Sequence, residues 1–112
     1  MQTWAHAMSS LNCDALIHYQ IGGDQFQIPI EYEKVEKVSI RYEGLITKYC
    51  GEESAPRVLM ISENDSQINS LMNIEKTLFP IAQPKLFFAT IQHVLGQDKP
   101  TFINHKQNRL VI

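Results

Sequence analysis

Apolar residues recur along this chain with two different periods, and each change of period marks a new element. Residues 15–21 are rich in strand-forming side chains, and residues 26–33 alternate apolar with polar side chains, as a half-buried strand does. The polar, glycine-containing segment 22–25 between them predicts a turn, so the two strands are expected to form a hairpin. Pro29 lacks a backbone N–H, which favours a sheet edge or a strand end at that point.

Helical spacing follows the predicted hairpin. Apolar side chains three or four residues apart predict one face of a helix of about four turns: Val35, Val38, Tyr42, Leu45, Ile46 and Tyr49. Gly51 lies where a helix-ending glycine is common, and Gly44 inside the helix predicts a close packing contact. The same spacing between Trp4 and Leu11 predicts a short helix at the start of the chain.

The second half of the chain predicts one central strand, two helices and two short strands. Residues 58–62 form a continuous apolar run, as in a strand covered on both faces. One helix is expected between Asn64 and Pro80, and a second between Pro84 and Gly96. Their inner faces are predicted to carry Ile68, Leu71, Met72, Glu75 and Leu78, and then Phe87, Phe88, Ile91, Val94 and Leu95. With strands at 101–103 and 109–112, the predicted order is α-β-β-α-β-α-α-β-β, a mixed α/β fold.

Composition limits the size and class of the protein. The 112 residues suffice for one domain, and 44% apolar with 20% charged residues is typical of a folded chain. The net charge of −2 argues against a generally basic protein that coats nucleic acid. Two cysteines, Cys13 and Cys50, without zinc spacing indicate reduced thiols and a cytoplasmic protein. The sequence has no apolar run of about 20 residues and no signal-peptide pattern, so no membrane association is expected.

Three carboxylates are predicted to converge on the hairpin. Glu31 and Glu33 lie two residues apart on one strand and therefore share a face. Pairing around the turn brings Asp14, at the start of the other strand, towards the same end. Like charges that close raise each other's pKa unless a cation offsets them, and oxygen ligands favour Mg²⁺ or Mn²⁺ over zinc.

Basic residues follow this acidic cluster. At about 100° per residue, four cations project within roughly 60° of one another on the predicted helix: Lys34, Lys37, Arg41 and Lys48. A basic face beside a metal-binding carboxylate cluster suits a nucleic-acid phosphodiester. The alternative is a solvated helix face with Glu33 and Lys37 as an ordinary ion pair.

These residues resemble the PD-(D/E)XK nuclease superfamily. The matching segments are Asn-Cys-Asp-Ala-Leu-Ile-His-Tyr at 12–19, Ile-Pro-Ile-Glu-Tyr-Glu-Lys-Val-Glu-Lys at 28–37, Arg-Tyr at 41–42, and Tyr49. More narrowly, they resemble nuclease-like domains of mobile-element proteins linked to plasmid replication and mobilisation. The resemblance covers residues 12 to about 62 and implies a restriction-endonuclease-like mixed sheet flanked by helices. It also implies a DNA-binding hydrolase that uses magnesium.

Carried over to this sequence, the resemblance assigns roles residue by residue. Asp14 and Glu31 become metal ligands, and Glu33 stands where the superfamily usually has its catalytic lysine. Glu33 then binds metal or orients water, as in restriction endonucleases with Glu at this position, and Lys37 returns the missing positive charge. The motif's proline before the first Asp is Cys13 here, and little chain precedes Asp14 for another strand, so a fragment of a longer protein or an abbreviated core is expected.

Other interpretations remain open at this point. The nuclease-like fold could be a catalytically inactive module for DNA binding or dimerisation, with a second copy or a larger parent protein as partner. A small protein-interaction or sensor domain with merely solvated acidic residues is a third interpretation. His18 shares the parity of Asp14 but is more typical of a structural hydrogen bond, and Tyr42 lies on the apolar helix face, where core packing competes with a role in the site.

Overall fold

The computed structural model describes residues 13–34, 39–52 and 55–111. Across these residues the protein is a mixed α/β fold with one six-stranded sheet in the order β1-β2-β3-β4-β5-β6. The strands are β1 (Ala15–Ile21), β2 (Asp24–Glu33), β3 (Val58–Ser62), β4 (Leu86–Thr90), β5 (Thr101–Ile103) and β6 (Arg109–Val111). The helices are α2 (Ser39–Cys50), α3 (Asp65–Leu78) and α4 (Ile91–Gly96). The helix predicted between Trp4 and Leu11 lies outside the described residues, as do Val35 and Val38.

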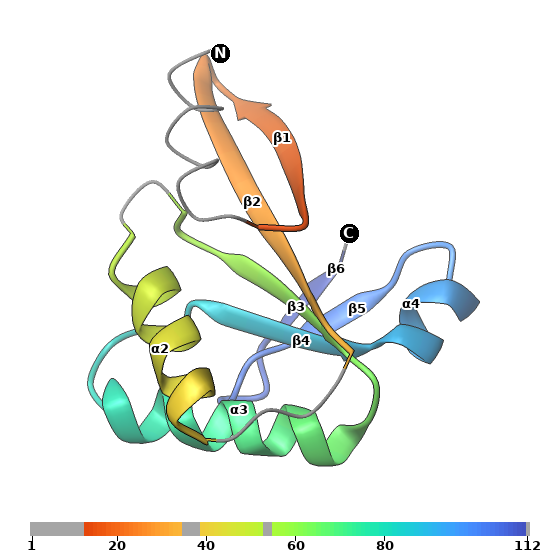
Figure 1. Ribbon diagram of the computed structural model, residues 1–112. Helices are drawn as coiled ribbons and strands as arrows, with labels where there is room; N and C mark the ends of the chain where they lie inside the picture. The colour runs from red at the N-terminus through yellow and green to blue at the C-terminus, as the bar shows by residue number, and fades with distance from the viewer. Residues whose placement is uncertain (1–12, 35–38, 53–54, 112) are drawn as a thin grey trace.

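The predicted hairpin is confirmed, with a tighter turn than expected. β1 and β2 pair antiparallel from Ala15 opposite Ile30 to Ile21 opposite Asp24, so only Gly22 and Gly23 form the turn. Both glycines have positive φ, 55° and 95°, which suits a two-residue hairpin connection. The hairpin projects beyond the other strands (Figure 1).

Pro29 lies where the sequence predicts, at a local edge of the sheet. β3 pairs with β2 only from Ile30 to Glu33, so Pro29 faces a paired strand on the β1 side alone. The missing N–H of proline therefore removes no hydrogen bond to β3.

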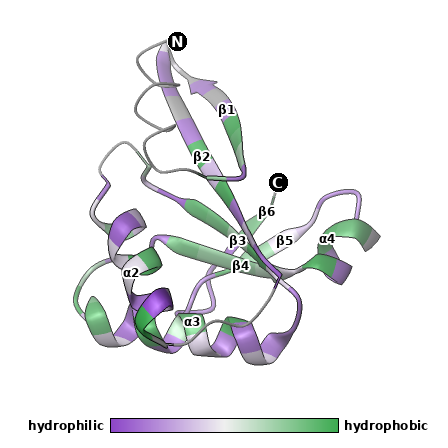
Figure 2. Cartoon of the chain, viewed as in Figure 1, coloured by the Kyte–Doolittle hydropathy of each residue, from purple (hydrophilic) through white to green (hydrophobic). Residues whose placement is uncertain are grey.

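Two parallel connections build the centre of the sheet. β2 pairs parallel with β3 through the crossover that contains α2, and β3 pairs parallel with β4 through α3. The central position predicted for residues 58–62 is confirmed, because β3 lies between β2 and β4 and four of its five residues are buried. β3 and β4 are both strongly apolar along their length (Figure 2).

Each face of the sheet has its own apolar core. On one face α2 and α3 pack together over β3 and β4; the buried members include Tyr42, Ile46, Tyr49, Leu71, Met60 and Phe88. On the other face Ile28, Leu59, Phe87, Ala89 and Phe102 form a smaller cluster that Val94 of α4 partly covers. No helix in the described residues is long and apolar enough to cross a membrane.

The predicted helix between Pro84 and Gly96 is wrong. Residues 86–90 form β4, and only residues 91–96 are helical. Phe87 and Phe88 are both buried, as expected, but on opposite faces of the sheet. Leu95, predicted to face inward, is 80% exposed, and Leu78 of α3 is also exposed. The polar hydroxyl of Thr90 accepts a hydrogen bond from the His93 N–H and so begins the short helix.

A second correction concerns the polar face of β2. Alternation predicts a half-buried strand, yet Gln27 and Glu33 are each 1% exposed. Both crossover helices lie on the face of the sheet that carries Glu33. Gln27 contacts His18 on the same face of the hairpin. The close packing contact predicted at Gly44 is also wrong. Gly44 is exposed, and a Cβ at this position would meet nothing within 4 Å.

Candidate functional site

Backbone pairing fixes Asp14 next to the second strand of the hairpin. The Asp14 N–H donates to the Ile30 carbonyl at 3.1 Å. In return, the Tyr32 N–H donates to Asp14 Oδ2 at 2.8 Å. The carboxylate of Asp14 is therefore held at β2 beside Glu31, and it remains exposed to solvent.

Glu31 lies half-buried between the sheet and α2. The Tyr49 hydroxyl donates to Glu31 Oε2 at 2.6 Å. Burial raises the pKa of the Glu31 carboxyl above its ordinary value, the Tyr49 hydrogen bond lowers it, and the charges of Asp14 and Glu33 raise it again. Lys48 lowers it slightly. The structure thus brings Asp14 and Glu33 close enough to Glu31 for their charges to raise its pKa.

Glu33 occupies a different environment from the other two carboxylates. It lies opposite Ser62 at the carboxyl ends of β2 and β3, and it is 1% exposed. In this arrangement Glu33 acts on Glu31 through its charge. Its predicted role as a metal ligand remains a prediction, and Lys37 lies outside the described residues.

The basic residues do not form one helix face. Lys34 follows β2 directly and is not helical, which corrects the predicted stripe. Arg41 and Lys48 are both exposed on α2, and their spacing of seven residues places them on the same side of the helix. Lys48 Nζ lies 4.7 Å from the centroid of the Tyr49 ring, next to the residue that binds Glu31. The structure therefore places Lys48 at the acidic site and Arg41 about two turns away.

The donor set decides which metal could fit. Among the described residues, no group of three or more His, Cys, Asp and Glu side chains is arranged to hold a metal ion. Zinc needs three or four such ligands. Mg²⁺ keeps several waters and commonly uses only one or two carboxylates plus substrate phosphates. Asp14 and Glu31 therefore fit a hydrated Mg²⁺ or Mn²⁺ better than a closed zinc site.

Tyr49 is the polar partner that the helical pattern alone does not reveal. It shares the buried face of α2 with Tyr42 and Ile46, as expected for a core residue. A buried tyrosine usually finds a partner for its hydroxyl, so the signal was present in the residue type. Burial and the neighbouring Glu31 raise the pKa of Tyr49, which keeps the hydroxyl protonated as a donor.

Two other candidate residues, His18 and Tyr42, make hydrogen bonds within the fold. The Gln27 side-chain amide lies 3.1 Å from His18 Nδ1, an interaction within the hairpin. Tyr42 is 1% exposed, and its hydroxyl accepts a hydrogen bond from Gln67 Nε2 at 3.0 Å. These contacts agree with the structural interpretations of both residues.

The cysteines lack the surroundings of a nucleophile. Both are free thiols. Burial, together with the nearby Glu75, raises the pKa of Cys50 to about 11. Burial also raises the pKa of Cys13. A thiol that stays protonated at neutral pH is a poor nucleophile.

Comparisons of the chain with protein families, curated proteins and solved structures found no match.

Proposed function

We propose that this protein is a DNA-associated domain of the restriction-endonuclease-like kind that hydrolyses phosphodiesters with Mg²⁺ or Mn²⁺. The observation that carries the proposal is the placement of Asp14 beside Glu31, through the paired backbone of β1 and β2. The charges of Asp14 and Glu33 raise the pKa of Glu31, and a divalent cation would relieve this repulsion.

Each residue has a defined part in the proposal. Asp14 and Glu31 hold the cation, which supplies charge stabilisation at the phosphate and activation of water. Tyr49 orients Glu31 through its 2.6 Å hydrogen bond. Lys48, beside the acidic site, contacts the nucleic-acid backbone.

The remaining basic and acidic residues have supporting roles in the proposed site. Arg41 and Lys34 contact the backbone further along the strand, and Lys37 stabilises phosphate charge at the site. Glu33 contributes as the third carboxylate behind Glu31. The hairpin, the α2 crossover and the parallel β3 agree with the segment order that the nuclease resemblance implies. The mobile-element and plasmid setting stays part of the proposal on that resemblance alone.

A second candidate is a nuclease-like module that binds DNA or dimerises without cleaving. The deep burial of Glu33, in the position where the superfamily usually has lysine, favours it. Without that lysine or an accessible substitute, phosphate would bind without being cleaved.

Incubation of the full chain with supercoiled and linear DNA in Mg²⁺ or Mn²⁺ tests both candidates. Cleavage that is lost in Asp14→Ala and Glu31→Ala supports the hydrolase, and Glu43→Ala, an exposed carboxylate on α2, should leave it unchanged. DNA retention without cleavage, weakened by Lys48→Glu, supports the binding module. If the protein neither cleaves nor retains DNA at low salt, both candidates are wrong.

A further inference from the structure

A pocket lies away from the acidic site, between α3 and the β5–β6 hairpin. It has a volume of about 740 Å³ and shares no lining residue with the Asp14–Glu31 pair. Sites for small molecules commonly measure about 300–1,000 Å³. The hollow exists because α2 and α3 cover the sheet only as far as β4, which leaves the same face open towards β5 and β6.

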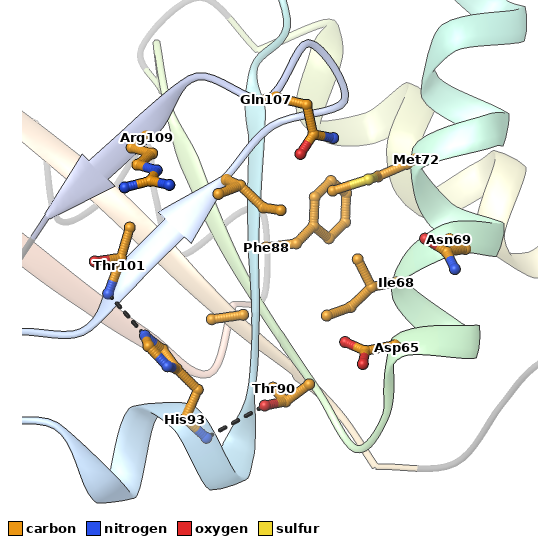
Figure 3. A pocket seen from close by; sticks show the side chains of 12 residues that line it. Asp65, Ile68, Asn69, Met72, Phe88, Thr90, His93, Thr101, Gln107 and Arg109 are labelled. Carbon is orange, nitrogen blue, oxygen red and sulfur yellow. Dashed lines mark hydrogen bonds between the residues drawn. The ribbon is translucent and has the colours of Figure 1, made fainter.

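One part of this pocket is apolar. Ile68 and Met72 of α3 and Phe88 of β4 line it, and Figure 3 shows the Phe88 ring beside both. These three side chains belong to the main core and are at most 8% exposed. The floor is held in place by its packing in the core, and the small exposed parts of these side chains offer apolar contact to a ligand.

The walls carry opposite charges. Asp65 and Asn69 project from α3 on one side, and Arg109 lies on the β6 side across the pocket (Figure 3). No hydrogen bond or ion pair within the described part of the chain engages these three side chains. The Arg109 guanidinium can pair with phosphate in a bidentate manner, while the carboxylate and amide can bind amino and ring N–H groups.

His93 belongs to the remaining wall and makes two hydrogen bonds to neighbouring elements. Its Nε2 accepts a hydrogen bond from the Thr101 N–H at 3.0 Å. Its own backbone N–H donates to the Thr90 hydroxyl at 3.2 Å. The pocket is thus lined by one acidic side chain, Asp65, and one basic side chain, Arg109, on either side of an apolar floor.

We infer that this pocket binds a nucleotide, with the base on the Ile68–Phe88 floor towards Asp65 and the phosphate at Arg109. A nucleotide combines the three required features: a flat body, amino or ring N–H groups, and an anion. A fatty acid would satisfy Arg109 but would leave Asp65 facing apolar chain, at a desolvation cost. The inference stands on this pocket and not on phosphodiester hydrolysis at Asp14 and Glu31.

Titration of the full ¹⁵N-labelled chain with deoxyadenosine monophosphate, followed by NMR, tests the inference. The amide signals of Asn69, Thr101 and Arg109 should shift. Arg109→Ala should weaken binding by about tenfold or more, as expected for losing a charge-assisted contact. Deoxyadenosine, which has no phosphate, should bind weakly and equally to the wild type and to this variant.

Matched controls separate this site from the rest of the molecule. Arg57→Ala removes an exposed arginine that lies over Phe87, on the opposite face of the sheet, and should leave binding unchanged. Glu31→Ala should also still bind the nucleotide, even if it abolishes cleavage. A short oligodeoxyadenylate identifies the source: tighter binding than the monomer indicates a nucleotide within a strand, and weaker binding indicates a free nucleotide. The absence of shifts, or equal weakening by Arg57→Ala and Arg109→Ala, would overturn the inference.

Discussion

At the scale of single residues, the helical pattern locates buried polar groups without revealing their partners. Glu75 falls on the predicted inner face of α3, and it is indeed 2% exposed. Its Oε2 accepts hydrogen bonds from the N–H groups of Lys85 at 2.9 Å and Leu86 at 3.2 Å. These donors lie ten and eleven residues further along the chain, at the start of β4, where helical spacing wrongly predicts a helix. The position could therefore be predicted from spacing, whereas the contact depends on the tertiary fold.

Replacing Glu75 tests how far this carboxylate stabilises the start of β4. Glu75→Ala leaves the buried Leu86 N–H and the adjacent Lys85 N–H without their acceptor. We expect a loss of about 2–4 kcal/mol in the free energy of unfolding, because each unsatisfied buried donor costs about 1–3 kcal/mol. Glu75→Gln keeps an acceptor oxygen and avoids a buried charge, so its loss should be less than half as large. Urea denaturation measures both, with Lys76→Ala as an exposed neighbouring control.

At the scale of elements, alternation and turn chemistry predict the hairpin well, while helical spacing misleads around β4. Apolar residues at 87, 88, 91, 94 and 95 satisfy a helical pattern. The two phenylalanines are instead buried on opposite faces of the sheet, which only a strand allows. Short apolar runs fit both periods, and pairing with β3 decides between them.

The two-residue turn gives the element-scale prediction. Gly22 has a φ of 55°, a conformation that asparagine tolerates and β-branched residues do not. A Cβ there would meet nothing within 4 Å, so only the backbone conformation is at issue. Gly22→Val should lower the free energy of unfolding by about 1–2 kcal/mol, and Gly22→Asn should change it by less than about 0.5 kcal/mol.

Gly44 provides the matched comparison for the turn. It lies in α2 with open space at its Cβ position and without a positive φ. Gly44→Ala should therefore raise stability by up to about 1 kcal/mol, because alanine loses less backbone freedom in a helix. Thermal unfolding of the three variants measures the set. A Gly22→Val variant as stable as the wild type would contradict the strained turn.

At the scale of the whole molecule, the two crossovers determine the surroundings of the acidic site. Sequence parity places Glu31 and Glu33 on one face of β2, and the paired hairpin adds Asp14. Local pattern does not say which face the helices will cover. Because α2 and α3 both pack on the face of Glu31 and Glu33, this face is partly withdrawn from water. Burial of these carboxylates follows from topology and so could not be predicted from residues 24–33 alone.

This burial makes the stability of the molecule depend on pH. Burial and the charges of Asp14 and Glu33 raise the pKa of Glu31 above 4.5, its ordinary value. The folded state therefore binds this proton more tightly than the unfolded state does. The resulting stabilisation is complete below pH 4.5 and is lost as the pH rises through the folded-state pKa, with a slope of at most about 1.4 kcal/mol per pH unit.

Glu31→Gln isolates this contribution. Glutamine keeps an oxygen for the Tyr49 hydroxyl but cannot ionise, so the variant should be more stable than the wild type at pH 8 and equal to it near pH 4. Glu75, whose pKa burial also raises, titrates in both proteins and cancels in the difference. If Asp14 and Glu31 hold a cation as proposed, millimolar Mg²⁺ should raise the stability of the wild type at pH 8, because only the folded state offers that site, and should leave Glu31→Gln unchanged. Parallel stability curves from pH 4 to 8 would show that Glu31 carries no such cost, and a divalent cation would then have no repulsion to relieve at this site.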